Sequence, residues 1–380
     1  MGPPLLVDKS VIHGFSHRHI SILYQYYTPV ITPILINEIL GDLSKDKDSE
    51  KAKAIVASLA ARTHGIRSWV VPDARELALA SLMGQNIPLN GQIPTFDGES
   101  VITKRGTIGH VMDEPFEQKI LRRWRHGDFN LDEVEMARYI RKEAVKDFKP
   151  LQKAFRENSK GKRFNSLEEM ILWVDEQEIA KKSDEAKIRY LCNVIDVNPS
   201  LQNEILKKWN ASKCLFSEYA PYAFYFYRTI TICSIGIASE TLSSGKDSKT
   251  HFDIEYLLYL PFSKVFASGD RRVHEPLSKF LLRQDQNFLY KDDLQKDLKA
   301  IEAYLEFPQD QTTPEIKDKL TLALWTDDKD RKKRPPNPKE VQTKALKDIQ
   351  DLFDGSIKLR DRKRLKDTPH NKALRELSLV

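Results

Sequence analysis

The chain has 380 residues, with 61 Lys and Arg against 55 Asp and Glu, so its formal net charge is +6. This length suffices for about two or three domains, and the balanced composition excludes collagen, coiled coil and wholesale disorder. The basic excess is compatible with an anionic partner. Three cysteines, none spaced as CxxC, argue against a cysteine-built zinc site and favour a reducing compartment. The N-terminal residues lack the pattern of a secretory signal, so we expect a cytoplasmic protein.

The first hundred residues alternate between short apolar runs and helix-like stretches, which is typical of a parallel α/β sheet. We expect a strand at 5–7 and a helix over 14–27. A β-branched stretch at 30–32 then precedes a helix opened by Pro33. A solvated turn or helix start at 46–53, a strand at 68–71 and a helix over 74–83 follow in chain order. Residues 85–107 are rich in Gly, Pro and Asn, which predicts a loop.

Residues 110–240 have a helical pattern. Within them, 219–238 is apolar and about as long as a membrane span, but it carries Arg228 near its middle. A charge at the centre of a bilayer costs roughly 2.5–3.5 kcal/mol even on the most lenient scale. We therefore expect a buried core helix here and no membrane partner.

The last third of the chain returns to the α/β pattern and then becomes basic. We expect a polar linker at 242–250, a helix over 252–260, a strand at 265–267, and helices over 276–282 and 294–304. Residues 326–366 hold 14 Lys and Arg against 8 Asp and Glu. Such a basic extension favours non-specific nucleic-acid affinity or contact with a partner protein.

Four acids occupy similar positions relative to the predicted elements. Asp8 ends the first strand, Glu38 lies in the helix opened by Pro33, Asp253 begins a helix, and Asp270 follows the strand at 265–267. Because groups at the carboxyl ends of parallel strands meet in one crevice, we expect these acids to converge. Carboxylates this close repel one another unless a cation lies between them, and oxygen ligands favour Mg²⁺ or Mn²⁺. Two such ions activate a water for attack on a phosphodiester.

The chain resembles the PIN-domain nucleases in five segments, which together cover under half of its length. They are LLVDKSVI, VITPILINEIL, SWVVPDARELALASLMG, FDIEYLLYLPFSKVFASGD and FLYKDDLQKDLKAI. The resemblance implies that Asp8, Glu38, Asp253 and Asp270 bind the metal and catalyse RNA cleavage. It also implies that the hydroxyls of two serines support these acids, namely Ser10 and Ser268.

The resemblance implies a three-layer α/β/α PIN-like domain with a central parallel sheet. One departure is that 215 residues separate Glu38 from Asp253, which we interpret as a helical insertion. The expected organisation is a first part of the PIN-like domain at 1–105, an α-helical insertion at 106–244, a second part at 245–307 and a helical, basic C-terminal extension at 308–380.

Other residues compete for these roles. Asp73 also follows a strand, although Pro72 before it indicates ordinary helix initiation, and Glu255 is an alternative to Asp253. A strand-terminal Asp is often only a helix cap. Five histidines lie near the acids and permit a histidine-ligated metal, although substrate contacts or plain surface positions are the favoured interpretation: His13, His17, His19, His251 and His274.

Basic residues near the acids and along the predicted helices suit phosphate contacts: Arg271, Arg272, Lys104, Arg105, Arg122, Arg123 and Arg125. The leading hypothesis is a metal-dependent endonuclease acting on RNA. A non-catalytic nucleic-acid-binding or scaffold protein on the same fold is the alternative, and a phosphatase or nucleotide hydrolase is a third, without a P-loop to support it. Control by a regulatory protein partner is expected of a nuclease, and a homo-oligomer is left open.

Overall fold

The structure is a computed structural model of the chain and describes residues 2–46, 48–63, 69–94, 99–102, 108–111, 115–143, 149–158, 162–242 and 250–306. The chain divides into two units. A small antiparallel hairpin of β4 (Glu99–Ile102) and β5 (Ile108–Val111) belongs to one of them. All other described helices and strands belong to the second unit, which contains every acid predicted to form the site.

A five-stranded parallel sheet forms the centre of the second unit. Its order is β3-β2-β1-β6-β7. The strands are β1 (Pro4–Val7), β2 (Thr28–Ile31), β3 (Trp69–Val70), β6 (Val265–Ser268) and β7 (Asn287–Tyr290). The chain winds from β1 outward to β3, and after the long helical region it returns on the other side of β1. The boundary between β1 and β6 is therefore a topological switch point, where α/β sheets open a crevice at the carboxyl ends of their strands.

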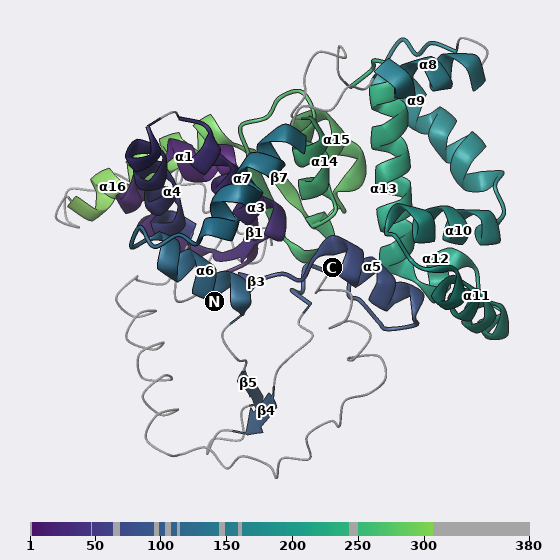
Figure 1. The fold of residues 1–380 in the computed structure, drawn as a ribbon, viewed down its shortest axis with the longest axis horizontal. Helices are drawn as coiled ribbons and strands as arrows, with labels where there is room; N and C mark the ends of the chain where they lie inside the picture. Colours follow the sequence, from purple (N-terminus) through teal and green to yellow (C-terminus); the bar gives the residue numbers. More distant parts are fainter. Residues whose placement is uncertain are drawn as a thin grey trace. The chain divides into compact units, whose positions relative to one another are not determined.

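Helices from both ends of the chain surround this sheet (Figure 1). They are α1 (Lys9–Gly14), α2 (His17–Tyr26), α3 (Pro33–Gly41), α4 (Ser49–Thr63), α5 (Ala74–Leu82), α14 (Thr250–Leu257), α15 (His274–Leu281) and α16 (Lys291–Glu306). Helices α2 and α16 contact each other and the sheet, and His19 Nε2 lies 3.0 Å from Glu302 Oε2 between them. Helix α14 contacts α3 and α15. The predicted α/β class with a central parallel sheet is confirmed, and the arrangement is consistent with three α/β/α layers.

Eight further helices follow one another between the two halves of the sheet. They are α6 (Phe116–Trp124), α7 (Leu131–Glu143), α8 (Lys149–Asn158), α9 (Leu167–Val174), α10 (Asp184–Val194), α11 (Pro199–Ser212), α12 (Phe216–Tyr219) and α13 (Pro221–Ala238). Figure 1 shows α8 to α12 gathered around the long helix α13, which also contacts α5 and α14. The helical character of this region is confirmed, whereas the division of the chain into four segments remains a prediction.

Helix α13 is the apolar segment considered above as a membrane span. It begins with Pro221 at its first turn and buries much of its length. Arg228 forms a two-point ion pair with Asp175, at 2.8 Å from Nε and 2.7 Å from Nη2. Asp175 opens a short π-helix, η2 (Asp175–Ala180), directly after α9. The prediction of a core helix is confirmed. Over the described residues, the search for a helix with the length and hydropathy to cross a bilayer found none.

Several predicted element boundaries are wrong, for local reasons. The helix predicted over 14–27 is α2, which begins only at His17 because Ser16 caps it by accepting a hydrogen bond from the His19 amide at 3.1 Å, and helix α1 before it was not predicted. The stretch 46–53 was predicted as a turn or helix start, and the second alternative is confirmed, since α4 begins at Ser49; the length of this helix was not predicted. The segment FLYKDDLQKDLKAI, expected as a closing helix, begins in β7 (Asn287–Tyr290) ahead of the helix predicted over 294–304, and the predicted loop at 85–107 contains β4.

The helix predicted over 252–260 is also shorter than expected. Helix α14 ends at Leu257, and a 3-10 turn, η3 (Leu260–Phe262), leads into β6. Helix α13 supports this junction, since the Tyr222 hydroxyl donates to the Leu258 carbonyl at 3.2 Å and the Tyr225 hydroxyl to the Leu257 carbonyl at 2.6 Å. The helical region thus helps to fix the end of the helix that carries Asp253.

We predict that Tyr222→Phe lowers the free energy of unfolding by about 1–3 kcal/mol, because it leaves the buried Leu258 carbonyl without its donor. Urea denaturation measures the change. The control is Tyr139→Phe, whose side chain is 59% exposed and should change stability by less than about 0.5 kcal/mol. Equal stability of Tyr222→Phe and the wild type would contradict the role given to this contact.

Candidate metal centre

Asp8 lies at the switch point and is held by three hydrogen-bond donors. It follows β1 directly and is only 5% exposed. Its Oδ1 accepts from the Ser10 hydroxyl at 2.6 Å and from the Val11 amide at 3.0 Å, so it also caps α1. Its Oδ2 accepts from the Ser268 hydroxyl at 2.5 Å, across from the neighbouring strand β6. The structure thus brings both predicted supporting serines, Ser10 and Ser268, into direct contact with Asp8.

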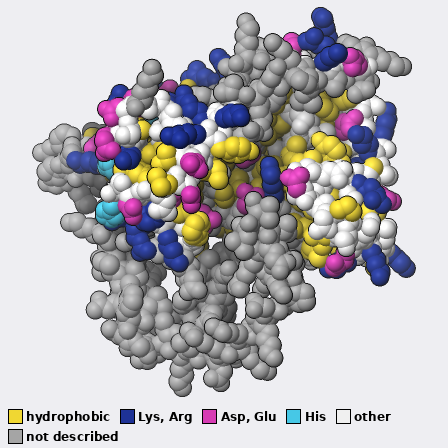
Figure 2. Space-filling view, in the orientation of Figure 1, with side chains coloured by type: hydrophobic (Ala, Val, Ile, Leu, Met, Phe, Trp, Pro, Cys, Tyr) yellow, Lys and Arg dark blue, Asp and Glu magenta, His cyan; other side chains and the backbone are white. Residues whose placement is uncertain are grey.

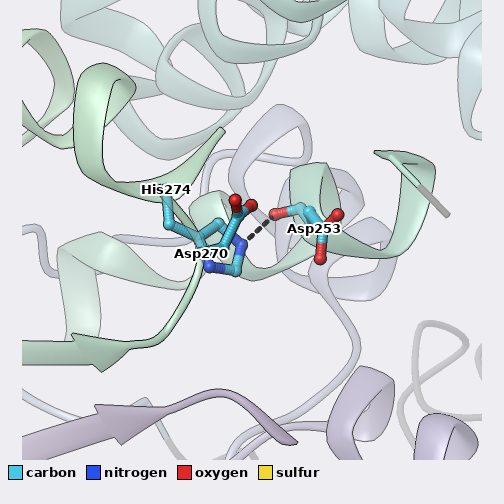
Figure 3. A group of neighbouring side chains, drawn as sticks. All are labelled: Asp253, Asp270 and His274. Atoms are coloured by element: carbon cyan, nitrogen blue, oxygen red, sulfur yellow. Dashed lines mark hydrogen bonds between the residues drawn. The ribbon is translucent and has the colours of Figure 1, made fainter. Parts of the chain in front are cut away.

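His274, at the start of α15, connects Asp8 to Asp253. Its side chain is fully buried, with Nδ1 2.7 Å from Ser268 Oγ and 3.6 Å from Asp8 Oδ2. Its Nε2 lies 2.7 Å from the main-chain carbonyl oxygen of Asp253 (Figure 3). A carbonyl can only accept, so Nε2 carries a proton.

The same hydrogen bonds indicate the charge of the His274 ring. The Ser268 hydroxyl has one proton and donates it to the Asp8 carboxylate, so Nδ1 must donate to Ser268 in turn. With both nitrogens protonated, the ring is an imidazolium paired with Asp8. Burial lowers the pKa of His274, but the hydrogen bond and charge of Asp8 raise it to about 9. For the acid Asp8 the effect of burial has the opposite sign and raises the pKa. His274 and the two serines nevertheless hold the pKa of Asp8 below its usual value.

Asp270 and Asp253 form the open part of the centre. The main-chain amides of Arg272 and Val273 donate to Asp270 Oδ1 at 2.6 Å and 3.3 Å. The other oxygen, Asp270 Oδ2, is buried without a hydrogen-bond partner. One ligand atom each from Asp253, Asp270 and His274 lie within 4.8 Å of one another, so this cluster has the residue types and spacing to hold a metal ion.

Asp253 is the acid whose charge is least compensated. It is half-buried near the start of α14. Burial and the neighbouring charges of Asp270, Glu38 and Asp8 raise the pKa of Asp253 to about 7, while His274 lowers it. The electrostatic interaction of Asp253 with all three other acids shows that the four predicted carboxylates lie in one neighbourhood.

Glu38 completes this neighbourhood from α3. Its Oε2 accepts a hydrogen bond from the Tyr256 hydroxyl at 2.5 Å, and Tyr256 is fully buried one turn after Asp253 on α14. Lys9 donates to the Glu38 carbonyl at 2.9 Å and forms an ion pair with Asp42 at 2.7 Å. Burial raises the pKa of Glu38 above its usual value, although the Tyr256 hydrogen bond and the charge of Lys9 partly offset this effect.

These contacts decide which groups suit a dication. The unpartnered Asp270 Oδ2 and the Asp253 carboxylate are available, and Glu38 keeps one oxygen beyond its bond to Tyr256. His274 would have to give up a hydrogen bond before it could bind a metal, because both of its nitrogens already have partners. A carboxylate-based centre is therefore favoured over a histidine-ligated one, and oxygen ligands suit Mg²⁺ or Mn²⁺.

The competing residues lie elsewhere or have other partners. Asp73 caps α5 by accepting from the Arg75 amide at 2.8 Å, as its position after Pro72 predicts. His13 and His17 belong to different helices and are exposed, and His19 pairs with Glu302. The side chain of His251 lies outside the described residues, as do Lys104, Arg105 and the basic extension.

The remaining predicted basic residues divide into two groups. Arg122 and Arg123 are on α6 with Arg125 just after it, and Arg123 forms an ion pair with Glu133. On the described part of the face in Figure 2, Lys and Arg side chains are interspersed with Asp and Glu. Arg271 and Arg272 follow Asp270 directly and are exposed. Of the two groups, only Arg271 and Arg272 are next to one of the four acids in the sequence.

Sequence reasoning missed the roles of His274, Tyr256 and Lys9. Tyr256 follows Asp253 by three residues, a spacing that places both on one helix face, so this signal was present. His274 follows Asp270 by four residues, but no sequence pattern indicates that the His274 ring contacts Asp8. Comparisons with known protein families, with curated proteins and with solved structures found no match.

We predict that His274→Gln lowers the free energy of unfolding by about 3–5 kcal/mol near neutral pH, because Asp8 is left buried without its counter-ion. The loss should be much smaller in an Asp8→Asn background, since residue 8 then carries no charge that requires His274 as its counter-ion. Denaturant titration of the two single variants and the double variant gives the coupling energy. Additive effects of the two substitutions would contradict the ion pair.

We predict that Asp253→Asn stabilises the metal-free protein above neutral pH. A folded-state pKa of about 7 lies above the ordinary value for Asp, so ionised Asp253 opposes folding at higher pH and has no effect once protonated in both states. The variant should gain up to about 4 kcal/mol near pH 8, about three pKa units at roughly 1.4 kcal/mol each, and the gain should vanish as the pH falls toward about 4. Urea denaturation with a chelator across this range measures it.

Asp285→Asn is the control of opposite sign. Burial raises the pKa of Asp285, but hydrogen bonds from Lys264 and Arg283 hold it below its usual value. This substitution should therefore lower stability at the pH where Asp253→Asn raises it. A loss of stability for Asp253→Asn near pH 8 would show that the Asp253 charge is already compensated within the protein.

Proposed function

We propose that the protein is a metal-dependent endonuclease that hydrolyses phosphodiester bonds, most readily in RNA, on a PIN-like domain. The observation that carries this proposal is the unpartnered, buried Asp270 Oδ2 beside Asp253, whose pKa is raised to about 7. Proteins rarely bury carboxylates together without compensation, because each ionised group disfavours the other. A bound dication would supply that compensation.

Asp253 and Asp270 would hold Mg²⁺ or Mn²⁺, with Glu38 as a further oxygen ligand and Asp8 behind them. When bound, such an ion polarises a phosphoryl oxygen and lowers the pKa of a water molecule. The chain's own residues hold the acids in the orientation that metal binding needs. Ser10, Ser268 and His274 fix the Asp8 carboxylate, and the Arg272 and Val273 amides orient Asp270 so that its second oxygen is left free.

The location of the acids supports the same reaction class. Asp8 and Asp270 follow adjacent strands at the switch point, where α/β proteins bind their ligands. The motifs that resemble the PIN-domain nucleases supply these acids from β1, α3, α14 and the end of β6. Exposed Arg271 and Arg272 lie next to Asp270 and give the crevice a basic margin suited to an anionic polymer.

A second candidate is a non-catalytic nucleic-acid-binding or scaffold protein on the same fold, and one observation favours it. His274 already neutralises Asp8 from within the protein, so part of the acidic cluster needs no metal. If the remaining carboxylates were also stable beside one another without a metal ion, the protein would bind nucleic acid at this site without cleaving it.

We predict Mn²⁺-dependent cleavage of labelled single-stranded RNA by the wild type and a loss of at least about a hundredfold in Asp270→Asn, which removes a charged ligand. Mn²⁺ should also raise the melting temperature of the wild type but not of this variant. Asp73→Asn is the matched control, because Asn caps a helix as well as Asp does and Asp73 lies outside the crevice.

Equal cleavage by Asp270→Asn and the wild type would remove the acids from the reaction and contradict the proposal. RNA binding without cleavage, together with no effect of Mn²⁺ on melting, would instead support the scaffold alternative. A melting shift without cleavage of RNA or DNA would keep the metal centre and reject the nuclease.

A further inference from the structure

A guanidinium group is stacked on an aromatic ring beside the candidate metal centre. The Cζ atom of Arg271 lies 4.1 Å from the centre of the Tyr290 ring. Tyr290 ends β7 and is in register with Ser268 on β6. Residues in register on parallel strands point to the same face, so Tyr290 lies on the face where Ser268 contacts His274. Strand β7 pairs directly with β6, whose Ser268 contacts Asp8.

Lys291 brings a second cation to the same edge of the sheet. It follows Tyr290 directly, and its alkyl chain crosses the loop that carries Asp270, because a Cβ atom on Gly269 would lie 3.5 Å from Lys291 Cδ. On the other side the chain covers Gly14, where a Cβ atom would lie 3.2 Å from the same carbon. Its ammonium is 4.0 Å from the Asp292 carboxylate, a distance at the outer limit of an ion pair.

The charge of Arg271 has no carboxylate partner in the part of the chain that the structure describes, where its guanidinium lies against the Tyr290 ring. The guanidinium is planar and carries its N–H groups in a fixed fork, whose edge matches two oxygens of a phosphate. The guanidinium also covers one face of Tyr290. The interaction offered here is therefore to a backbone phosphate and carries no information about the base.

We propose that Arg271 and Lys291 each bind a backbone phosphate of a nucleic-acid strand that passes from the four acids toward β7. The two residues are positioning residues: they hold the strand beside the acids and do not take part in bond breaking. The direction of the strand rests on the proposed nuclease function, whereas the phosphate interaction itself does not.

The test measures binding to the full chain in the presence of EDTA, so that no hydrolysis takes place. The probes are short fluorescent oligouridine and oligoadenosine RNAs, followed by anisotropy over a series of salt concentrations. The site variants are Arg271→Gln and Lys291→Gln. The controls are Arg189→Gln on α10 and Lys208→Gln on α11, which remove the same charges from surface pairs with Glu185 and Glu204.

Each site variant should weaken binding about three- to tenfold, the effect of one charge-assisted hydrogen bond to a phosphate. The slope of log affinity against log salt should become shallower by about 0.7 in each site variant, because one fewer phosphate is neutralised. Oligouridine and oligoadenosine should be affected equally, and the controls should bind nearly as the wild type does. Unchanged melting temperatures establish that the variants are folded.

Wild-type affinity and salt slope in both site variants would overturn the proposal, and so would an equal loss of affinity in the controls. A loss confined to one of the two RNAs would also overturn it, since it would indicate recognition of a base. Failure of the nuclease proposal is seen separately, as absence of Mn²⁺-dependent cleavage by the wild type, and it leaves the binding result in EDTA intact.

Discussion

Asp8 and His274 form a buried ion pair that the Ser268 hydroxyl bridges with hydrogen bonds. The other acids of the candidate metal centre lie around this pair. The contact joins the end of β1 to the end of β6 and the first turn of α15, and Asp8 and Ser268 are 260 residues apart in the sequence. His274 extends it by donating to the Asp253 carbonyl, so helix α14 is held at the same point. One hydrogen-bonded path therefore positions three of the four acids.

The pair leaves three carboxylates to be compensated in another way. Glu38 has the Tyr256 hydroxyl, Asp270 has two main-chain amides on one oxygen, and Asp253 has the nearby charge of His274. None of these contacts is a full counter-charge for its acid. Mutual repulsion between Asp253, Asp270 and Glu38 is then the physical basis for proposing a dication, and the basic margin beyond Asp270 is the basis for proposing a polyanionic substrate.

Much of this could be predicted from the sequence, because local patterns determine it. The apolar runs that became β1 and β6 each end near an Asp, and Pro33 marks the start of α3, so Asp8, Asp270 and Glu38 were identified without coordinates. Only the start of helix α4 was predicted, although Ala52, Val56 and Leu59 continue a helical spacing beyond it. Strand β7 was mistaken for helix because a short, largely apolar run before a charged helix has no distinguishing period. The His274 contact depends on how two distant segments meet, which spacing along the chain does not specify.

The central claim is that a dication bridges Asp253 and Asp270, and anomalous X-ray diffraction from crystals soaked in Mn²⁺ tests it most directly. The account predicts an anomalous peak bonded to Asp270 Oδ2 and to the Asp253 carboxylate, with both nitrogens of His274 still hydrogen-bonded to Ser268 and to the Asp253 carbonyl. A crevice without anomalous signal at saturating Mn²⁺, or an ion bonded to His274 in place of the two carboxylates, would contradict it.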